Sequence, residues 1–289
     1  MIPQLIASTA CQTGENPLWH PDERAVYWTD IPGGVIYRQA WGASDYEQVY
    51  NGDVVGGFTL QTDGALLLFG AGGKVQRLAG KTLTTVLENI SAELGTRFND
   101  VIADPMGRVL CGTMPTKARS GRLYRLDADL TLTQVVDHIG ISNGLGFTPN
   151  RAQMYYTDSD PARTIWQFDY DAATGTPTNQ AKWMVFTGGD AVPDGLTVDA
   201  EGCIWSAQWD GGCVIRFDPD GREMTRIHVP GAVKVSNITF GGPQRDEIFC
   251  TTGTPNGVFH APVGVKGFAG HPGKPLQVVR TLELKPLVK

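Results

Sequence analysis

The sequence has few cysteines, and no stretch of it is apolar enough to cross a membrane. Its five cysteines are an odd number and no two have C-x-x-C spacing, which argues against a disulfide framework or a zinc knot. We therefore expect small, buried thiols in a reducing cytoplasm. No run approaches the roughly 18 apolar residues of a spanning helix. The segment Met1–Leu5 lacks the basic and apolar pattern of a secretory signal, so we predict a cytoplasmic protein with no membrane partner.

Positive charge and familiar hydrolase motifs are also scarce. The formal net charge is −6 and the Lys and Arg residues are scattered, which argues against a nucleic-acid partner, because such a partner needs a basic footprint. There is no G-x-S-x-G segment, so serine-hydrolase chemistry is disfavoured. The five histidines have no paired spacing.

What the chain does contain is an internal repeat of six copies. The copies align without gaps over seven residues, and their first residues are separated by 41, 43, 44, 51 and 42 positions. A period of about 44 residues is typical of propeller blades. The copies begin at the following segments: Glu15–Pro21, Gly56–Thr62, Asn99–Pro105, Asn143–Pro149, Asp194–Ala200 and Ser236–Gly242.

Each copy carries three short strand patterns separated by turn residues, and most are followed by a fourth pattern further along. Radial repetition of four-stranded antiparallel sheets predicts an all-β, six-bladed β-propeller. Because the blades of a ring share one axis, we expect a single domain over residues 1–289. Either Leu5–Ala7 or Leu276–Val279 would close the ring by adding a strand to the last blade.

The first residue of five of the six copies carries a side-chain oxygen; the exception is Gly56. A closed ring would direct these oxygens toward one axis, where converging oxygens make a cation site. The alternative is that they only form turns, since Asn-Gly and Asp-Gly are common turn dipeptides. The shared register favours a single axial metal site over independent turns.

Several tracts at these positions resemble the SMP-30/gluconolactonase/luciferin-regenerating-enzyme family over essentially the whole chain. They are Gly14–Trp19, Thr96–Asp100, Leu110–Met114, Gly121–Arg125, Ser142–Leu145, Pro193–Leu196 and Asn237–Pro243. The resemblance implies that Glu15, Asn143 and Asp194 hold one divalent cation, with Asn99 beside it, binding a water or the substrate. Oxygen ligands favour Ca²⁺ first, with Mn²⁺, Fe²⁺ and Mg²⁺ as alternatives and Zn²⁺ a weaker fit because no His or Cys is offered.

The resemblance also implies hydrolysis of a sugar (aldono-)lactone such as gluconolactone or a pentonolactone, with the cation polarising the carbonyl. Asp194 would take the proton of the attacking water. Arg97 would donate to substrate oxygens, unless it is only a surface charge paired with Asp100. Asp100 would brace Arg97 or Asn99 at the substrate.

Two other functions remain open on the same fold. A phosphotriesterase would use the same cation, and a non-catalytic calcium-binding propeller would use no open coordination position. The segment Pro115–Ser120 is short and basic where some relatives carry an acidic lid. Lys117 or Arg119 would there suit a carboxylate or phosphate, unless the segment is a solvated hairpin tip. The expected partner is a small-molecule lactone, and the expected state is a monomer or weak dimer.

Overall fold

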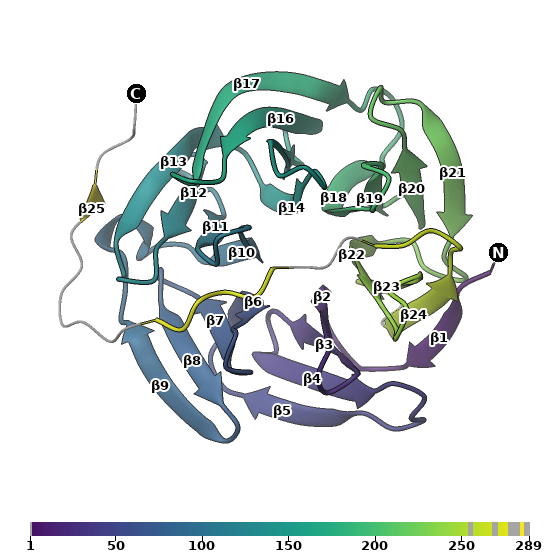
Figure 1. Cartoon of the computed structure of the whole chain (residues 1–289), viewed down its shortest axis with the longest axis horizontal. Helices are drawn as coiled ribbons and strands as arrows, with labels where there is room; N and C mark the ends of the chain where they lie inside the picture. Colours follow the sequence, from purple (N-terminus) through teal and green to yellow (C-terminus); the bar gives the residue numbers. More distant parts are fainter. Residues whose placement is uncertain (1, 254–256, 268–270, 277–283, 286–289) are drawn as a thin grey trace.

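The computed structural model describes residues 2–253, 257–267, 271–276 and 284–285. Six β-sheets stand around a common axis (Figure 1), and consecutive strands pair antiparallel within each sheet. The predicted six-bladed propeller of four-stranded antiparallel blades is therefore confirmed. The longest interval between copies, the 51 positions from Asn143 to Asp194, contains a long outer hairpin in the fourth blade, formed by Thr164–Asp171 and Thr176–Val185.

The blades are numbered here in chain order, and each runs from its innermost strand to its outermost. Blades 1 to 3 contain β2 (Gly14–His20), β3 (Ala25–Asp30), β4 (Val35–Ala40) and β5 (Glu47–Asn51); β6 (Val55–Leu60), β7 (Leu66–Gly70), β8 (Val75–Ala79) and β9 (Thr82–Leu87); and β10 (Phe98–Ala103), β11 (Val109–Thr113), β12 (Gly121–Leu126) and β13 (Leu132–Ile139). Blades 4 to 6 contain β14 (Ser142–Phe147), β15 (Gln153–Asp158), β16 (Thr164–Asp171) and β17 (Thr176–Val185); β18 (Val192–Val198), β19 (Ile204–Trp209), β20 (Cys213–Phe217) and β21 (Glu223–His228); and β22 (Val235–Gly241), β23 (Glu247–Thr252), β24 (Gly257–Pro262) and β1 (Gln4–Ala7). A short 3-10 helix, η1 (Ser91–Glu93), precedes blade 3.

The N-terminal segment closes the ring. Strand β1 pairs antiparallel with β24, with Gln4 opposite His260 and Leu5 opposite Phe259. Of the two segments considered from the sequence, Leu5–Ala7 is thus the outer strand of blade 6, while residues 277–279 lie outside the described residues. One element was not expected: β25 (Leu284–Lys285) pairs parallel with β13 and gives blade 3 a fifth strand.

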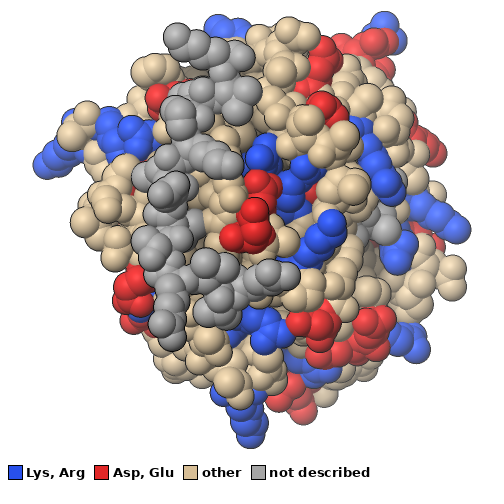
Figure 2. Space-filling model, turned by 60° about the vertical axis from the view of Figure 1, so that its left-hand side comes forward, with Lys and Arg blue, Asp and Glu red and all other residues tan. Residues whose placement is uncertain are grey.

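The surface carries charges of both signs. On the face shown in Figure 2, Lys and Arg residues lie among Asp and Glu residues without forming a continuous basic area. No helix within the described ranges has the length and apolar character that crossing a membrane requires. All five cysteines are free and buried, as expected from their number and spacing.

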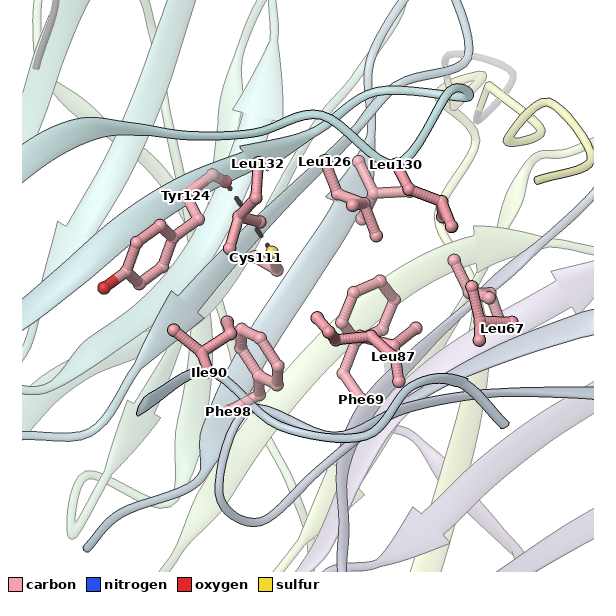
Figure 3. Packing of buried hydrophobic residues seen from close by; sticks show 13 residues of the cluster. Leu67, Phe69, Leu87, Ile90, Phe98, Cys111, Tyr124, Leu126, Leu130 and Leu132 are labelled. Atoms are coloured by element: carbon pink, nitrogen blue, oxygen red, sulfur yellow. Dashed lines mark hydrogen bonds between the residues drawn. The ribbon is translucent and has the colours of Figure 1, made fainter. Parts of the chain in front are cut away.

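The apolar core lies between neighbouring blades. Between blades 2 and 3, Leu67 and Phe69 of β7 pack against Phe98 of β10 and Leu126 of β12 (Figure 3). The rings of Phe69 and Phe98 meet edge to face, with centroids 5.3 Å apart, a favoured aromatic geometry. Burial of such clusters between all the sheets holds the inner strands at fixed positions around the axis.

Close approach of two blades explains the one copy that lacks a polar first residue. A Cβ added at Gly56 would lie 2.0 Å from the carbonyl oxygen of Phe98, far inside van der Waals contact. Glycine is therefore required where β6 meets β10.

Two described parts of the C-terminal segment, residues 263–267 and 271–276, lie at one end of the axis and on opposite sides of it (yellow in Figure 1). Gly267 bridges to Asp199 and Gly273 bridges to Gln61, while the Lys274 amide donates to the Gly107 carbonyl at 2.8 Å. These partners all lie in turns that follow inner strands. The two parts therefore lie at the end of the axis opposite the first residues of those strands.

Candidate active site

A cavity of about 410 Å³ opens where the inner strands begin. Five of the six residues predicted for the site line it: Glu15, Arg97, Asn99, Asn143 and Asp194. They come from four blades and lie far apart in the sequence, so the ring brings them together. The sixth, Asp100, lines a second cavity further along the axis.

A backbone irregularity at the same step of each inner strand helps to direct these side chains. The pairing register shifts in β2 between Glu15 and Leu18, in β14 between Ser142 and Leu145, and in β10 and β18 at the corresponding steps. A bulge of this kind changes the direction in which a side chain points and is frequent beside active sites. The bulges thus help to account for two adjacent residues of one inner strand facing the axis, one lining each cavity.

One hydrogen-bond chain connects four of the lining residues. The Arg97 Nη1 donates to Asn99 Oδ1 at 2.6 Å, and Asn99 Nδ2 donates to Asn143 Oδ1 at 2.6 Å. On the other side, Asn143 Nδ2 donates to Ser159 Oγ at 2.7 Å, and the Ser159 hydroxyl donates to the Pro193 carbonyl at 2.6 Å. The chain fixes both amides, so that Asn143 keeps its carbonyl oxygen on the Asn99 side.

In the part of the chain that the structure describes, Glu15 forms hydrogen bonds through one of its two carboxylate oxygens. Its Oε2 accepts from the Asn16 backbone amide and from Asn237 Nδ2, each at 3.0 Å. The same Asn237 nitrogen donates to Asp100 Oδ2 at 3.0 Å. Asn237 therefore links the candidate ligand Glu15 to Asp100 in the layer beneath, and no hydrogen bond joins Asp100 to Arg97.

The site concentrates negative charge in a buried place. Burial raises the pKa of the Glu15 carboxyl, and burial together with the charge of Glu15 raises the pKa of the Asp194 carboxyl well above its ordinary value. Burial lowers the pKa of Arg97, against the opposing pull of these carboxylates. One guanidinium does not balance them, so the site is short of positive charge.

The donor set fits a hard divalent cation. Asp194 Oδ1 is buried and has no hydrogen-bond partner among the described residues, so this oxygen is free to bind a ligand in the pocket. Within that same part of the chain, no three His, Cys, Asp or Glu side chains form a metal-binding group. The third donor to a cation would instead be the amide oxygen of Asn143, and carboxylate with amide oxygens suits Ca²⁺, Mg²⁺ or Mn²⁺ better than Zn²⁺.

The basic segment Pro115–Ser120 does not reach the pocket. Arg119 forms an ion pair with the buried Glu93 of η1, and its Nε donates to the Ala92 carbonyl at 3.1 Å, while Lys117 is exposed. Met114, just before this segment, lines the cavity, but residues 115–120 are not among its lining residues. Neither Lys117 nor Arg119 is therefore placed to receive an anionic substrate.

Two residues of the network were missed from the sequence. Asn237 occupies the second step of the sixth copy, where the other copies have Asn16, Gly57, Asp100, Gly144 and Gly195; the polar residues at this step could have revealed it. Ser159 lies in the loop after β15, outside the aligned positions. No periodic signal points to it.

The fold and this pocket define a six-bladed propeller with an oxygen-rich site at one end of its axis. The chain belongs to the SMP-30/Gluconolactonase/LRE-like family, whose sequence model matches residues 13–254. It is 42% identical over 247 residues to the pentonolactonase of Haloferax volcanii, covering 86% of this chain and 84% of that protein. It is 35% identical over 235 residues to the L-arabinolactonase of Azospirillum brasilense, covering 79% and 77%. Among solved structures, the calcium-binding protein regucalcin of Agrobacterium tumefaciens superposes with a TM-score of 0.85 at 26% identity, over 95% of this chain and 96% of that one.

Proposed function

We propose that this protein hydrolyses sugar lactones with the help of one divalent cation bound by Glu15, Asn143 and Asp194. The observation that carries the proposal is the unpartnered, buried Oδ1 of Asp194 beside a second buried carboxylate in an open pocket. The names of the relatives support the class, a hydrolase that acts on lactones. A pentonolactone is the first candidate substrate and gluconolactone the second.

When bound, the cation would polarise the lactone carbonyl and offset negative charge that develops on its oxygen; Ca²⁺ is the first candidate. Asn99, held between Arg97 and Asn143, would orient the water or a substrate hydroxyl. The Arg97 guanidinium, which lines the same pocket, would donate to substrate hydroxyl or ring oxygens.

Asp194 is the proposed proton acceptor. As the water oxygen bonds to the carbonyl carbon and the ring ester bond breaks, the proton would pass from water to the Asp194 carboxylate and then to the departing ring oxygen. The apolar part of the lining, Ile31, Met114, Ile141, Val192 and Trp209, would contact the sugar ring and limit the entry of water. Asp100 is proposed to act from below, through Asn237 and Glu15, rather than by contact with the substrate.

The test is a pH-indicator assay on a panel of pentonolactones, gluconolactone and the phosphotriester paraoxon. It is run on the protein as purified, after EDTA, and after Ca²⁺, Mn²⁺, Mg²⁺ or Zn²⁺ is restored. We expect lactone hydrolysis that EDTA removes and one of the cations restores, with Asp194→Ala inactive. Turnover of paraoxon alone would support a phosphotriesterase, and tight Ca²⁺ binding without any turnover would support a non-catalytic binding propeller.

A further inference from the structure

The mouth of the candidate active site is strongly acidic. Five carboxylates line the pocket, from Glu15, Asp160, Asp190, Asp194 and Asp210, and Arg97 is the one Lys or Arg side chain among its lining residues. One divalent cation together with this guanidinium would still leave two negative charges in excess. The negative net charge of the site therefore favours binding of ligands that are neutral or positively charged.

Three of these carboxylates are exposed and lie on one side of the opening. Asp160 is in the β15–β16 loop, Asp190 in the β17–β18 loop and Asp210 in the β19–β20 loop, all in blades 4 and 5. Arg97 precedes β10, in blade 3. A bound ligand would thus have the guanidinium on one flank and the three aspartates on the other.

The three aspartates are not neutralised by ion pairs. None forms a salt bridge to another residue in the described part of the chain. Arg163 directs its guanidinium to the carbonyl oxygens of Gly188, Gly189 and Ala191 at 2.6 to 3.0 Å, which fixes the loop that carries Asp190. Lys234 lies 4.8 Å from the ring centroid of Trp209, beside Asp210. These cations weaken the negative potential of two loops without forming ion pairs with their aspartates.

We infer that this acidic mouth selects uncharged lactones over lactones that carry a carboxylate, phosphate or sulfonate, and that it disfavours binding of the aldonate product. The inference rests on the proposed function and concerns its substrate class. It does not depend on the acidic side chains alone, because Asp194 Oδ1, buried and without a partner, independently marks the same pocket as one that binds a ligand.

Hydrolysis of a lactone changes the net charge of the bound molecule. A neutral lactone and one water give a hydroxy acid, which ionises to an aldonate and a proton at neutral pH. Substrate and product therefore differ by one negative charge. An exposed carboxylate about 6 to 10 Å from that charge would change its binding by roughly two- to fivefold, and salt would reduce the effect because the Debye length is only about 8 to 10 Å at physiological ionic strength.

The experiment compares one uncharged lactone, a pentono-1,4-lactone, with one that carries a free carboxylate, galactaro-1,4-lactone. The ratio of their kcat/KM values is measured at about 20 mM and 300 mM NaCl, and the inhibition constant of the pentonate product is measured alongside. The proteins are the unaltered enzyme, Asp160→Asn, Asp210→Asn and the triple variant with Asp190→Asn. The matched control is Asp45→Asn, which removes an exposed aspartate without a salt bridge that lies outside the pocket lining.

We expect the unaltered enzyme to prefer the uncharged lactone, and we expect salt to weaken that preference. Each single substitution should shift the ratio toward the anionic lactone by about two- to fivefold and the triple variant by about tenfold or more, with tighter pentonate inhibition in the same order. The Asp45→Asn ratio should stay unchanged. Equal use of both lactones, independent of salt and of all three aspartates, would overturn the inference while leaving a lactonase; hydrolysis of neither lactone would overturn it together with the proposed function.

Discussion

The axial channel contains two polar layers that come from adjacent steps of the same repeat. The upper layer holds Glu15, Asn99, Asn143 and Asp194, at the first step, and lines the open pocket. The lower layer holds Asn16, Asp100 and Asn237, at the second step, and lines a smaller cavity of about 240 Å³. The two layers differ in the groups to which their amide side chains are bonded, since Asn99 and Asn143 bond each other in the upper layer.

In the lower layer the amide side chains are fully used within the fold. Asn16 Nδ2 donates to the Phe58 carbonyl at 3.1 Å, and Asn16 Oδ1 accepts from the Phe58 amide at 3.0 Å. Asn237 Oδ1 accepts from the Ile238 amide at 2.8 Å. Glycine makes room for Asn237, since a Cβ at Gly195 would lie 2.1 Å from its side chain. Each layer leaves one buried carboxylate oxygen without a hydrogen-bond partner among the described residues, Asp194 Oδ1 above and Asp100 Oδ1 below, but Asp194 lies in the open pocket that Arg97 also lines. We therefore expect the amides of the lower layer to serve structure and the residues of the upper layer to bind the ligand.

The substitution Asp194→Asn tests the upper layer with the largest expected effect. It keeps the size of the side chain but removes one negative charge and the proposed proton acceptor, so kcat/KM should fall by about a thousandfold or more. Because Asp194 is buried near Glu15 and Asp100, loss of its charge should leave the metal-free protein at least as stable as before. Activity within tenfold of the unaltered enzyme would exclude Asp194 from catalysis.

Ser159→Ala tests the support of a candidate ligand. Without the hydroxyl, Asn143 Nδ2 loses its acceptor, and the amide is no longer held with its oxygen toward the site. We expect the cation to bind about 10- to 100-fold more weakly, as is usual when a residue that orients a ligand is lost. Titration calorimetry with Ca²⁺ measures this directly. Ser159→Thr keeps the hydroxyl and should recover most of the affinity; equal affinity in all three proteins would show that Ser159 does not orient Asn143.

Much of this arrangement could be predicted from the sequence, because the repeat shows both where each blade begins and which residue of its inner strand faces the axis. Glu15, Asn143 and Asp194 share the first step, and the ring brings them to one pocket. Asp100 was expected at the substrate, but it faces the lower cavity, because the bulge between Phe98 and Val101 places it further along the axis than Asn99. Ser159 escaped prediction because loop positions have no period. Closure by β1 was left open because both ends of the chain carry similar apolar segments.

Asn16→Ala tests the lower layer. It removes the two hydrogen bonds to Phe58 that connect β2 with β6, and it leaves buried backbone groups unsatisfied, so the free energy of unfolding should fall by about 1 to 3 kcal/mol. The Asn16 backbone amide still donates to Glu15. Ca²⁺ affinity should therefore change much less than in Ser159→Ala. If chemical denaturation showed no loss of stability while Ca²⁺ affinity collapsed, the division of roles between the two layers would be wrong.

The smallest expected effect is a pH dependence of the metal-free protein. The raised pKa values of Glu15 and Asp194 mean that the folded state holds protons which the unfolded state releases above about pH 4. Their contribution to stability is therefore lost as pH rises through that window. A bound cation replaces those protons, so the gain in Tm from Ca²⁺ should be larger at pH 8 than at pH 5, by a few degrees.

Thermal unfolding of the unaltered protein and of Asp194→Asn, with EDTA and with Ca²⁺, isolates the effect, because the other titrating groups are common to both. A Ca²⁺-induced gain that is the same at both pH values would mean that these carboxylates do not hold the cation, and a gain as pH-dependent in Asp194→Asn as in the unaltered protein would mean that Asp194 does not.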